Sequence, residues 1–327
     1  MCPLNRSAHF RSEYLLISVY SFMGRTLLIG HPGVSWREWL KGNRKDRDLV
    51  VLDPSDADGA PPGRLVLLRG GKATQSRFYG SLDSNRAPHV LIAALAELLA
   101  SAGEDALIQL PAHRPSPVGH QLLLMLAALA KPEHILMAEG TRAPCDAFPV
   151  GPEEVVLEKA FPPMVRAAQR KAHWLKMLEA CRPHQVDLAK VCIEGTRLGS
   201  GQRLQRMDLM RSGLEDAVWA ELTGASLFII SDEEPDETKI SRALDDFHVS
   251  RVQFASPDAY NGLLCSFVRG NGEDFGYGVI ERIDFESGIA HIKNSAEEPA
   301  PVRILRIGSL KIDASGSEHG EARPWQV

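Results

Sequence analysis

The stretch Thr26–Asp53 constrains the fold more than any other part of this sequence. It reads TLLIGHPGVSWREWLKGNRKDRDLVVLD: an apolar run, a turn rich in Gly and Pro, a short helix and a second apolar run. This order is typical of a phosphate-binding βαβ unit. The phosphate-loop pattern is G-x-x-x-x-G-K-[ST]. If Gly30 is the first glycine of this pattern, Ser35 stands at the position of the second glycine. Trp36 then stands at the position of the lysine, and Arg37 at the position of the serine or threonine. The scaffold of a phosphate loop is therefore present without its usual chemical groups.

Composition argues against several classes of protein. The chain has 327 residues, enough for two or three domains, and its net charge of −5 gives no overall basic excess that would indicate nucleic-acid binding. Its five cysteines are scattered and never spaced C-x-x-C. This pattern predicts neither a disulfide framework nor a zinc site, and it favours a reducing, cytoplasmic setting. No apolar run approaches the length of a membrane span, so we expect no membrane partner.

The N-terminal residues differ from the rest. Arg6 and Arg11 precede a short apolar run, Tyr14–Phe22, as in a signal peptide, but no small-residue cleavage site follows. We expect residues 1–22 to form a loosely ordered extension, and Met23 is an alternative start.

The remaining chain divides into an α/β part and a β-rich part. Residues 23–182 alternate strand and helix patterns, which predicts a mostly parallel sheet flanked by helices. Residues 183–313 carry strand-like runs between Gly, Asn and Asp turns, which predicts a smaller β-rich domain. The polar residues 314–327 are expected to form a flexible tail.

A basic segment, residues 158–182, ends the α/β part. It is predicted to be mostly helical, with Pro162 and Pro163 at its entry. Arg166 and Arg170 share one helical face through their i, i+4 spacing. The segment is either a solvated basic face or a lid that faces a phosphate group.

Several blocks follow one another in the order found in a known family. They are TLLIGHPG, VVLDPSDADGAPPG, RFYGSLDSNRAPHVLIAALAELL, the basic stretch, IEGTRLGSGQRL (Ile193–Leu204) and the C-terminal strands. With these blocks the chain resembles the Clp1/Grc3-type polynucleotide 5′-hydroxyl kinases, P-loop proteins that use ATP to phosphorylate RNA 5′ ends. The resemblance covers roughly residues 25–313 and implies a P-loop NTPase-like α/β domain followed by a β-rich domain.

The resemblance also implies a set of site residues. It places Asp53, Arg166 and Arg170 at catalytic positions, with Asp53 near the metal or the attacking hydroxyl and the two arginines on the lid. It places an ATP site around the phosphate loop, at Gly30, Pro32, Gly33, Ser35 and Arg37. It implies ATP and Mg²⁺ as ligands only if that loop is still functional, and an RNA or DNA 5′ end or a protein as partner.

The departures from the family pattern lie at the catalytic positions. Trp36 cannot supply the charge of the phosphate-loop lysine, and Arg37 cannot bind magnesium as Ser or Thr does. Gln109 stands near the position of the magnesium-orienting acid, and a neutral amide is a weaker magnesium ligand than a carboxylate. We therefore expect a degenerate, polynucleotide-kinase-like protein with little or no phosphoryl transfer. The alternatives are an active kinase with a rearranged site and an α/β scaffold that binds no nucleotide.

Some of these residues also have structural interpretations. Asp53 before Pro54 is a good turn-capping residue. Trp36 and Trp39 suit a helix core, with base stacking as the alternative. In the EGTRLG block we expect the glycines to form a tight loop, and Arg197 to satisfy carbonyl groups or a carboxylate.

Overall fold

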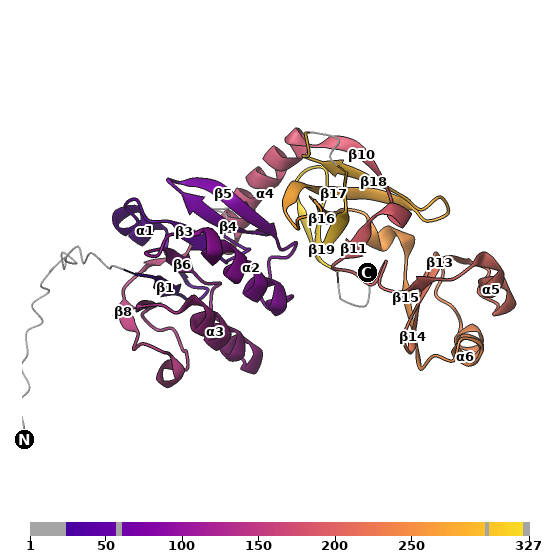
Figure 1. Ribbon diagram of the computed structural model, residues 1–327, viewed down its shortest axis with the longest axis horizontal. Coiled ribbons are helices and arrows are strands. Elements are labelled where there is room, and N and C mark those ends of the chain that lie inside the picture. The colour runs from indigo at the N-terminus through magenta and orange to yellow at the C-terminus, as the bar shows by residue number, and fades with distance from the viewer. Residues whose placement is uncertain (1–23, 57–60, 298–300, 323–327) are drawn as a thin grey trace, which may run out of the picture.

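The computed structural model describes residues 24–56, 61–297 and 301–322, so the predicted extension 1–22 lies outside the described residues. Figure 1 shows three lobes in a row: an α/β domain, a middle lobe built on a strongly curved sheet, and a small outer lobe. Helix α4 (Pro163–Ala180) runs from the first lobe to the second. Within the described part of the chain, no helix is both long and apolar enough to cross a bilayer.

The α/β domain is built on a seven-stranded sheet of order β5-β4-β3-β6-β1-β7-β8. The five strands from β3 to β8 in this order pair in parallel, as predicted, and β4 and β5 add an antiparallel edge. The strands are β1 (Thr26–Ile29), β3 (Leu49–Val51), β4 (Arg64–Arg69), β5 (Lys72–Phe78), β6 (Leu107–Gln109), β7 (His134–Ala138) and β8 (Glu153–Val155).

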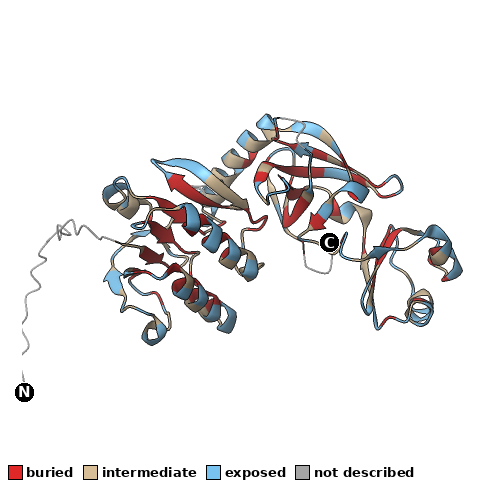
Figure 2. Cartoon of the chain, in the orientation of Figure 1, coloured by how far each residue is buried: buried red, intermediate tan, exposed pale blue. Residues whose placement is uncertain are grey.

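Both faces of this sheet are covered. Helices α2 (Pro88–Ser101) and α3 (Pro117–Ala130) cover one face, where Leu27 and Ile29 join their core. The short helix α1 (Arg37–Asn43) lies on the other face, where Leu28 packs with Trp36. Because successive strand side chains alternate between faces, the continuous apolar run of β1 is buried throughout, as Figure 2 shows in red.

The middle lobe carries the β-rich sheet, of order β10-β18-β17-β16-β19-β11, with β20 paired to β19. Strand β10 follows α4 directly and pairs with β18. The strands are β10 (Arg182–Asp187), β11 (Cys192–Glu194), β16 (Leu263–Val268), β17 (Asp274–Asp284), β18 (Ile289–Asn294), β19 (Ile304–Ile312) and β20 (Glu318–Glu321). Residues 314–327 were predicted to form a flexible tail. That prediction was wrong for the strand β20, whose Glu318 and Glu321 bond to other segments.

The outer lobe is a feature that the sequence patterns did not separate. Its four-stranded sheet, of order β12-β13-β14-β15, and two helices enclose a hydrophobic cluster of their own. The elements are β12 (Gln202–Arg203), α5 (Arg206–Arg211), β13 (Ala217–Thr223), β14 (Ser226–Ser231), α6 (Glu237–Asp246) and β15 (Arg251–Ala255). The β-rich part therefore contains two separate sheets.

Short elements complete the described chain. Strand β2 (Val34–Ser35) pairs with β9 (Glu158–Lys159). The single-turn helices are η1 (Cys145–Ala147), η2 (Leu188–Lys190) and η3 (Pro257–Tyr260).

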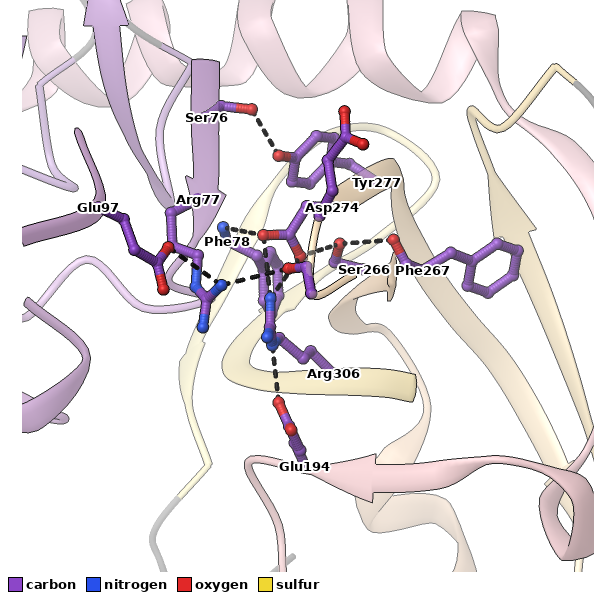
Figure 3. A network of polar contacts seen from close by, with 12 residues as sticks. Ser76, Arg77, Phe78, Glu97, Glu194, Ser266, Phe267, Asp274, Tyr277 and Arg306 are labelled. Carbon is purple, nitrogen blue, oxygen red and sulfur yellow. Dashed lines mark hydrogen bonds and ion pairs between the residues drawn. The ribbon is translucent and has the colours of Figure 1, made fainter. Parts of the chain in front are cut away.

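A buried polar network joins the first two lobes (Figure 3). Asp274 of β17 accepts hydrogen bonds from the Phe78 amide of β5 and from Ser266 Oγ, and it pairs with Arg306. Next to it, Ser76 and the Tyr277 hydroxyl share a hydrogen bond of 2.6 Å. Since this network links β5 to the β-rich sheet, it fixes the relative position of the two lobes.

Candidate functional site

A cavity opens where β1, β3 and β6 end. Its volume is about 330 Å³, and a second cavity of about 300 Å³ adjoins it. Asp53, Ser55, Ala112 and Arg166 line both, so the two form one continuous site beneath the start of α4. The carboxyl ends of parallel strands are the usual place for a ligand in an open α/β sheet.

The loop after β1 uses its own amides for hydrogen bonds within the protein. The Gly33 amide donates to His31 Nδ1 at 3.1 Å, and the Arg37 amide donates to Ser35 Oγ at 3.2 Å. Val34 and Ser35 are paired as β2 with β9. Pro32 has no amide hydrogen. A phosphate loop instead directs successive free amides at its anion. In this loop the Gly33 and Arg37 amides are engaged by side chains, so they are not directed at a ligand.

Trp36 closes the floor of the cavity. Its side chain is 5% exposed, packs with Leu28 and meets Trp39 edge-to-face at 5.5 Å. The predicted core role of Trp36 is thus confirmed. A methyl group at Gly30 would lie 3.1 Å from Trp36 Nε1, so the glycine leaves room for the indole. Among the described residues, that buried Nε1 has no hydrogen-bond partner.

Gln109 ends β6, the strand that pairs with β1 and β3. Its side chain is 7% exposed and donates from Nε2 to Asp56 Oδ2 at 3.0 Å. A neutral amide therefore stands at the strand end where the resemblance places a metal-orienting acid.

Asp53 serves a turn while it lines the cavity. Its Oδ1 accepts hydrogen bonds from the Ser55 amide at 2.9 Å and from Ser55 Oγ at 2.7 Å. These bonds are those of an Asx turn after β3. The turn-capping interpretation is confirmed, and a catalytic role for Asp53 stays a prediction.

The two lid arginines have different surroundings. Arg170 makes a two-pronged ion pair with Glu318 of β20, at 2.7 and 2.9 Å, which Trp174 Nε1 joins at 2.9 Å. Arg166, one turn earlier, lines both cavities, and its buried Nε has no partner among the described residues. The structure thus gives Arg170 a role in joining α4 to the β-rich sheet, whereas Arg166 stays available to a ligand.

The larger cavity has an excess of positive charge. Four cationic side chains and two carboxylates line it: Arg37, Lys41, Arg44, Arg166, Asp53 and Asp56. Glu38 pairs with two of the cations, Lys41 at 2.6 Å and Arg37 at 3.7 Å, which leaves a smaller positive excess. Burial lowers the pKa of Arg44, whose guanidinium donates to the Leu68 carbonyl at 2.9 Å. Two unpartnered N–H groups, on Trp36 and Arg166, lie at the same cavity. Such a lining favours an anionic ligand.

The sequence itself matches no known protein family and no curated protein. The structure, however, is similar to solved structures of Clp1p with Pcf11p. One concerns an extended interface between the two proteins and ATP loss in a glycine-to-arginine point mutant; it has a TM-score of 0.52 at 9% identity and covers 90% of this chain and 76% of that chain. A second, wild-type Clp1p with a segment of Pcf11p, has a TM-score of 0.52 at 11% identity and covers 89% of this chain and 75% of that chain.

The chain has a Clp1-like fold.

The Clp1-like fold confirms the resemblance at the level of architecture. In this fold the loop after β1 and the end of β6 are neighbours, so Trp36, Arg37 and Gln109 line one cavity. Sequence identities of 9% and 11% show a shared fold and nothing about the activity of the cavity.

The side chains at the cavity do not fit a magnesium–ATP complex. Magnesium is held by carboxylates, hydroxyls and phosphate oxygens. Here Arg37 and Gln109 stand where the resemblance places the hydroxyl and acid ligands. Of the two carboxylates at the cavity, Asp53 accepts from Ser55 and Asp56 accepts from Gln109. Within the described residues, no three His, Cys, Asp or Glu side chains come together as a metal site.

The sequence patterns missed several lining residues. Lys41 and Arg44 lie on and just after α1 and project into the cavity, and Ser55 and Asp56 follow Asp53. Their spacing along the helix and turn was visible in the sequence. Only the closure of the cavity by α4 shows that they share a site.

Proposed function

We propose that this Clp1-like protein binds the phosphate of a nucleotide or of a polynucleotide 5′ end at the cavity below α4, with little or no phosphoryl transfer. The observation that carries this proposal is the meeting of Trp36, Arg37 and Gln109 at one positively lined cavity. The groups that would move a phosphate are replaced there, and the charges that would hold one are retained.

The physical argument rests on how phosphoryl transfer is catalysed. The protein contributes positioning and charge stabilisation, supplied by the loop lysine, the magnesium ion and the loop amides. Here an indole stands in for the lysine, and the Gly33 and Arg37 amides are engaged by side chains. Arg166, whose buried Nε has no partner among the described residues, can attract an anion in its ground state, which lowers a dissociation constant without accelerating transfer.

A protein partner is a second candidate. The similar structures are complexes of Clp1p with Pcf11p. Beside the cavity, large apolar side chains are exposed at the start of α4: Phe161 at 41%, Met164 at 85% and Val165 at 42%. Exposed apolar groups gathered at one place are typical of a docking surface.

The test is a titration of ATP, with and without Mg²⁺, read by thermal shift. A ligand at a hundred times its dissociation constant stabilises the folded state by about 2.7 kcal/mol. We expect stabilisation that does not depend on Mg²⁺ and that Arg166→Gln removes. Arg211→Gln, on an exposed arginine of α5, is the matched control and should leave it unchanged. No stabilisation by millimolar ATP or by a 5′-phosphorylated oligonucleotide would refute phosphate binding.

A second measurement separates the proposed protein from an active kinase. Labelled ATP is incubated with a 5′-hydroxyl oligonucleotide, and label on the oligonucleotide is counted. We expect no transfer above the uncatalysed rate. Transfer that Arg166→Gln abolishes would establish the active kinase with a rearranged site and refute the degenerate interpretation.

A further inference from the structure

A different cavity lies at the junction of the first two lobes. Its volume is about 620 Å³, and it is bounded by the end of β5, the start of α2, the loop after β11 and strand β19. Ser81 and Arg86 line it, whereas Leu82, Asp83 and Ser84 line the smaller cavity below α4. The segment 81–86 therefore separates the junction cavity from the site already described.

Four arginines line this junction cavity, and two of them are neutralised. Arg306 pairs with the buried Asp274 at 3.0 Å and with Glu194 at 2.7 Å. Arg77 pairs with Glu97 at 3.2 Å. Figure 3 shows both pairs beside the strand β5. Ion pairing thus accounts for the charges of Arg77 and Arg306.

The other two guanidinium groups are not neutralised. Arg86 donates to the Ala322 carbonyl, and no acidic side chain of the described residues lies within ion-pairing distance of it. Arg197 likewise has no acidic side chain of the described residues within ion-pairing distance. Its buried Nε also has no hydrogen-bond partner among those residues. The sequence had indicated that Arg197 would satisfy carbonyl groups or a carboxylate, and the described structure shows neither contact. Both side chains are half-buried, and a buried donor without a partner is costly, so Arg197 Nε would gain a hydrogen bond from a ligand that brings acceptor oxygens.

The backbone holds Arg197 at the cavity wall. Gly195 has φ of +91°, and a Cβ there would overlap the Ile307 carbonyl, so only glycine fits at this position. On the other side of Arg197, the Gly199 amide donates to the buried carboxylate of Glu221 at 2.9 Å. The predicted structural role of these glycines is confirmed. A rigid loop of this kind presents its arginine in one place.

The start of α2 adds to the positive field. This helix has 14 residues, its N-cap is Ala87 without a side-chain hydrogen bond, and no acid lies in its first turn. The positive end of the helix dipole is therefore not compensated by the helix's own residues. His89, in that first turn, also lines the cavity.

We propose that the junction cavity binds the phosphate group of a nucleotide-sized ligand, with Arg86 and Arg197 as its two charged contacts. A phosphate group concentrates two charges and several acceptor oxygens in one place, which suits two guanidinium groups that line one cavity from different lobes. The walls beside them are apolar, with Phe78, Val90 and Ile307, and accommodate an uncharged portion of the ligand. The proposal is independent of the function proposed for the cavity below α4.

The experiment is a calorimetric titration of the full chain with AMP and, separately, with adenosine. We expect AMP to bind and adenosine to bind at least about tenfold more weakly, since it lacks the charged contact. Arg197→Gln and Arg86→Gln should each weaken AMP binding by roughly tenfold to a hundredfold. Arg211→Gln, the exposed control, should leave it unchanged.

The Arg166→Gln variant distinguishes the two sites. If AMP binding survives Arg166→Gln and is weakened by Arg197→Gln, the junction cavity holds the phosphate. If only Arg166→Gln weakens it, or if millimolar AMP does not bind at all, the junction proposal is overturned. A short oligoglutamate peptide that binds more tightly than AMP and depends on Arg197 would also overturn it, in favour of an acidic protein segment.

A measurement on the unaltered chain covers the case in which a variant fails to fold. Arginines are modified with phenylglyoxal, with and without AMP, and the modified positions are mapped by mass spectrometry. Bound AMP should protect Arg86 and Arg197 and leave Arg211 equally reactive. Equal modification of Arg86 and Arg197 with and without AMP would contradict the proposal.

Discussion

The substitution Asp274→Asn tests what joins the first two lobes. The Asp274 side chain is 0% exposed, and its oxygens accept from Arg306 Nη1 at 3.0 and 3.1 Å, from Ser266 Oγ at 2.7 Å and from the Phe78 amide at 3.0 Å. Asparagine keeps the shape but removes the charge, and one of its two polar atoms becomes a donor that faces other donors. The substitution therefore breaks an ion pair and a link between β5 and β17 together.

The magnitude follows from burial. Removing one partner of a buried ion pair costs about 3–5 kcal/mol, because the other charge stays buried without compensation. Arg306 is 11% exposed and keeps Glu194, which is 43% exposed and well hydrated. This partial compensation places the expected loss of unfolding free energy at about 3 kcal/mol, the lower end of that range.

The assay is urea unfolding, with Glu281→Gln as the matched control. Glu281 pairs with Lys293 at 2.9 Å between side chains that are 39% and 45% exposed, so its loss should cost less than about 1 kcal/mol. In the double variant Asp274→Asn with Arg306→Met, part of the lost stability should return, because no unpaired charge is buried. If Asp274→Asn is no more destabilising than Glu281→Gln, the network does not stabilise the junction and the reasoning fails.

Three further predictions concern close packing and buried carboxylates. A Cβ at Gly308 would overlap the backbone of Gly80, so Gly308→Ala should lower the free energy of unfolding by about 1–3 kcal/mol in urea titrations, whereas Gly42→Ala on the exposed face of α1 should not lower it. Glu221 is 1% exposed and accepts from two glycine amides and an indole, so Glu221→Gln should cost about 1–3 kcal/mol and lower the thermal midpoint; an unchanged midpoint would contradict this. Burial by itself would raise the pKa of Glu318, but the hydrogen bonds from its arginine and tryptophan partners on α4 outweigh it and hold that pKa below its ordinary value. The stability that Glu318 adds is therefore present at neutral pH and is lost as pH falls through its folded pKa, so wild type and Glu318→Gln should converge in urea midpoint in acid; a difference independent of pH would refute the assignment.

Much of the β-rich part was readable from the sequence. The strand-like runs 251–255 and 263–268 coincide with β15 and β16, and the run 225–230 is displaced by one residue from β14. Gly, Asn and Asp turns bound these runs, and a strand that is buried on both faces, such as β16, is mostly apolar. Local composition suffices for such strands.

Two strands of mixed polarity, β5 and β20, were not predicted. The stretch GGKATQS, residues 70–76, contains no apolar run and so predicts a loop, yet β5 begins at Lys72, after Gly70 and Gly71 turn the chain with φ of +56° and +81°. An edge strand such as β5 is half exposed, so its sequence lacks the apolar run that marks a central strand. Strand β20 was not predicted for the same reason, because it is a polar edge strand.

At the candidate site, too, some features could be predicted from the sequence and others only from the tertiary structure. The sequence by itself determined the residue types at the cavity below α4: Trp36, Arg37 and Gln109 stand at the positions where the resemblance places the groups that transfer phosphate. Only the tertiary structure decided how the arginines are used. Arg170 pairs with Glu318, 148 positions along the chain, while Arg166 and Arg197 face cavities. Residue type fixes which charge a side chain carries, but its partner is set by which distant segments the fold brings within reach, and no local pattern contains that information.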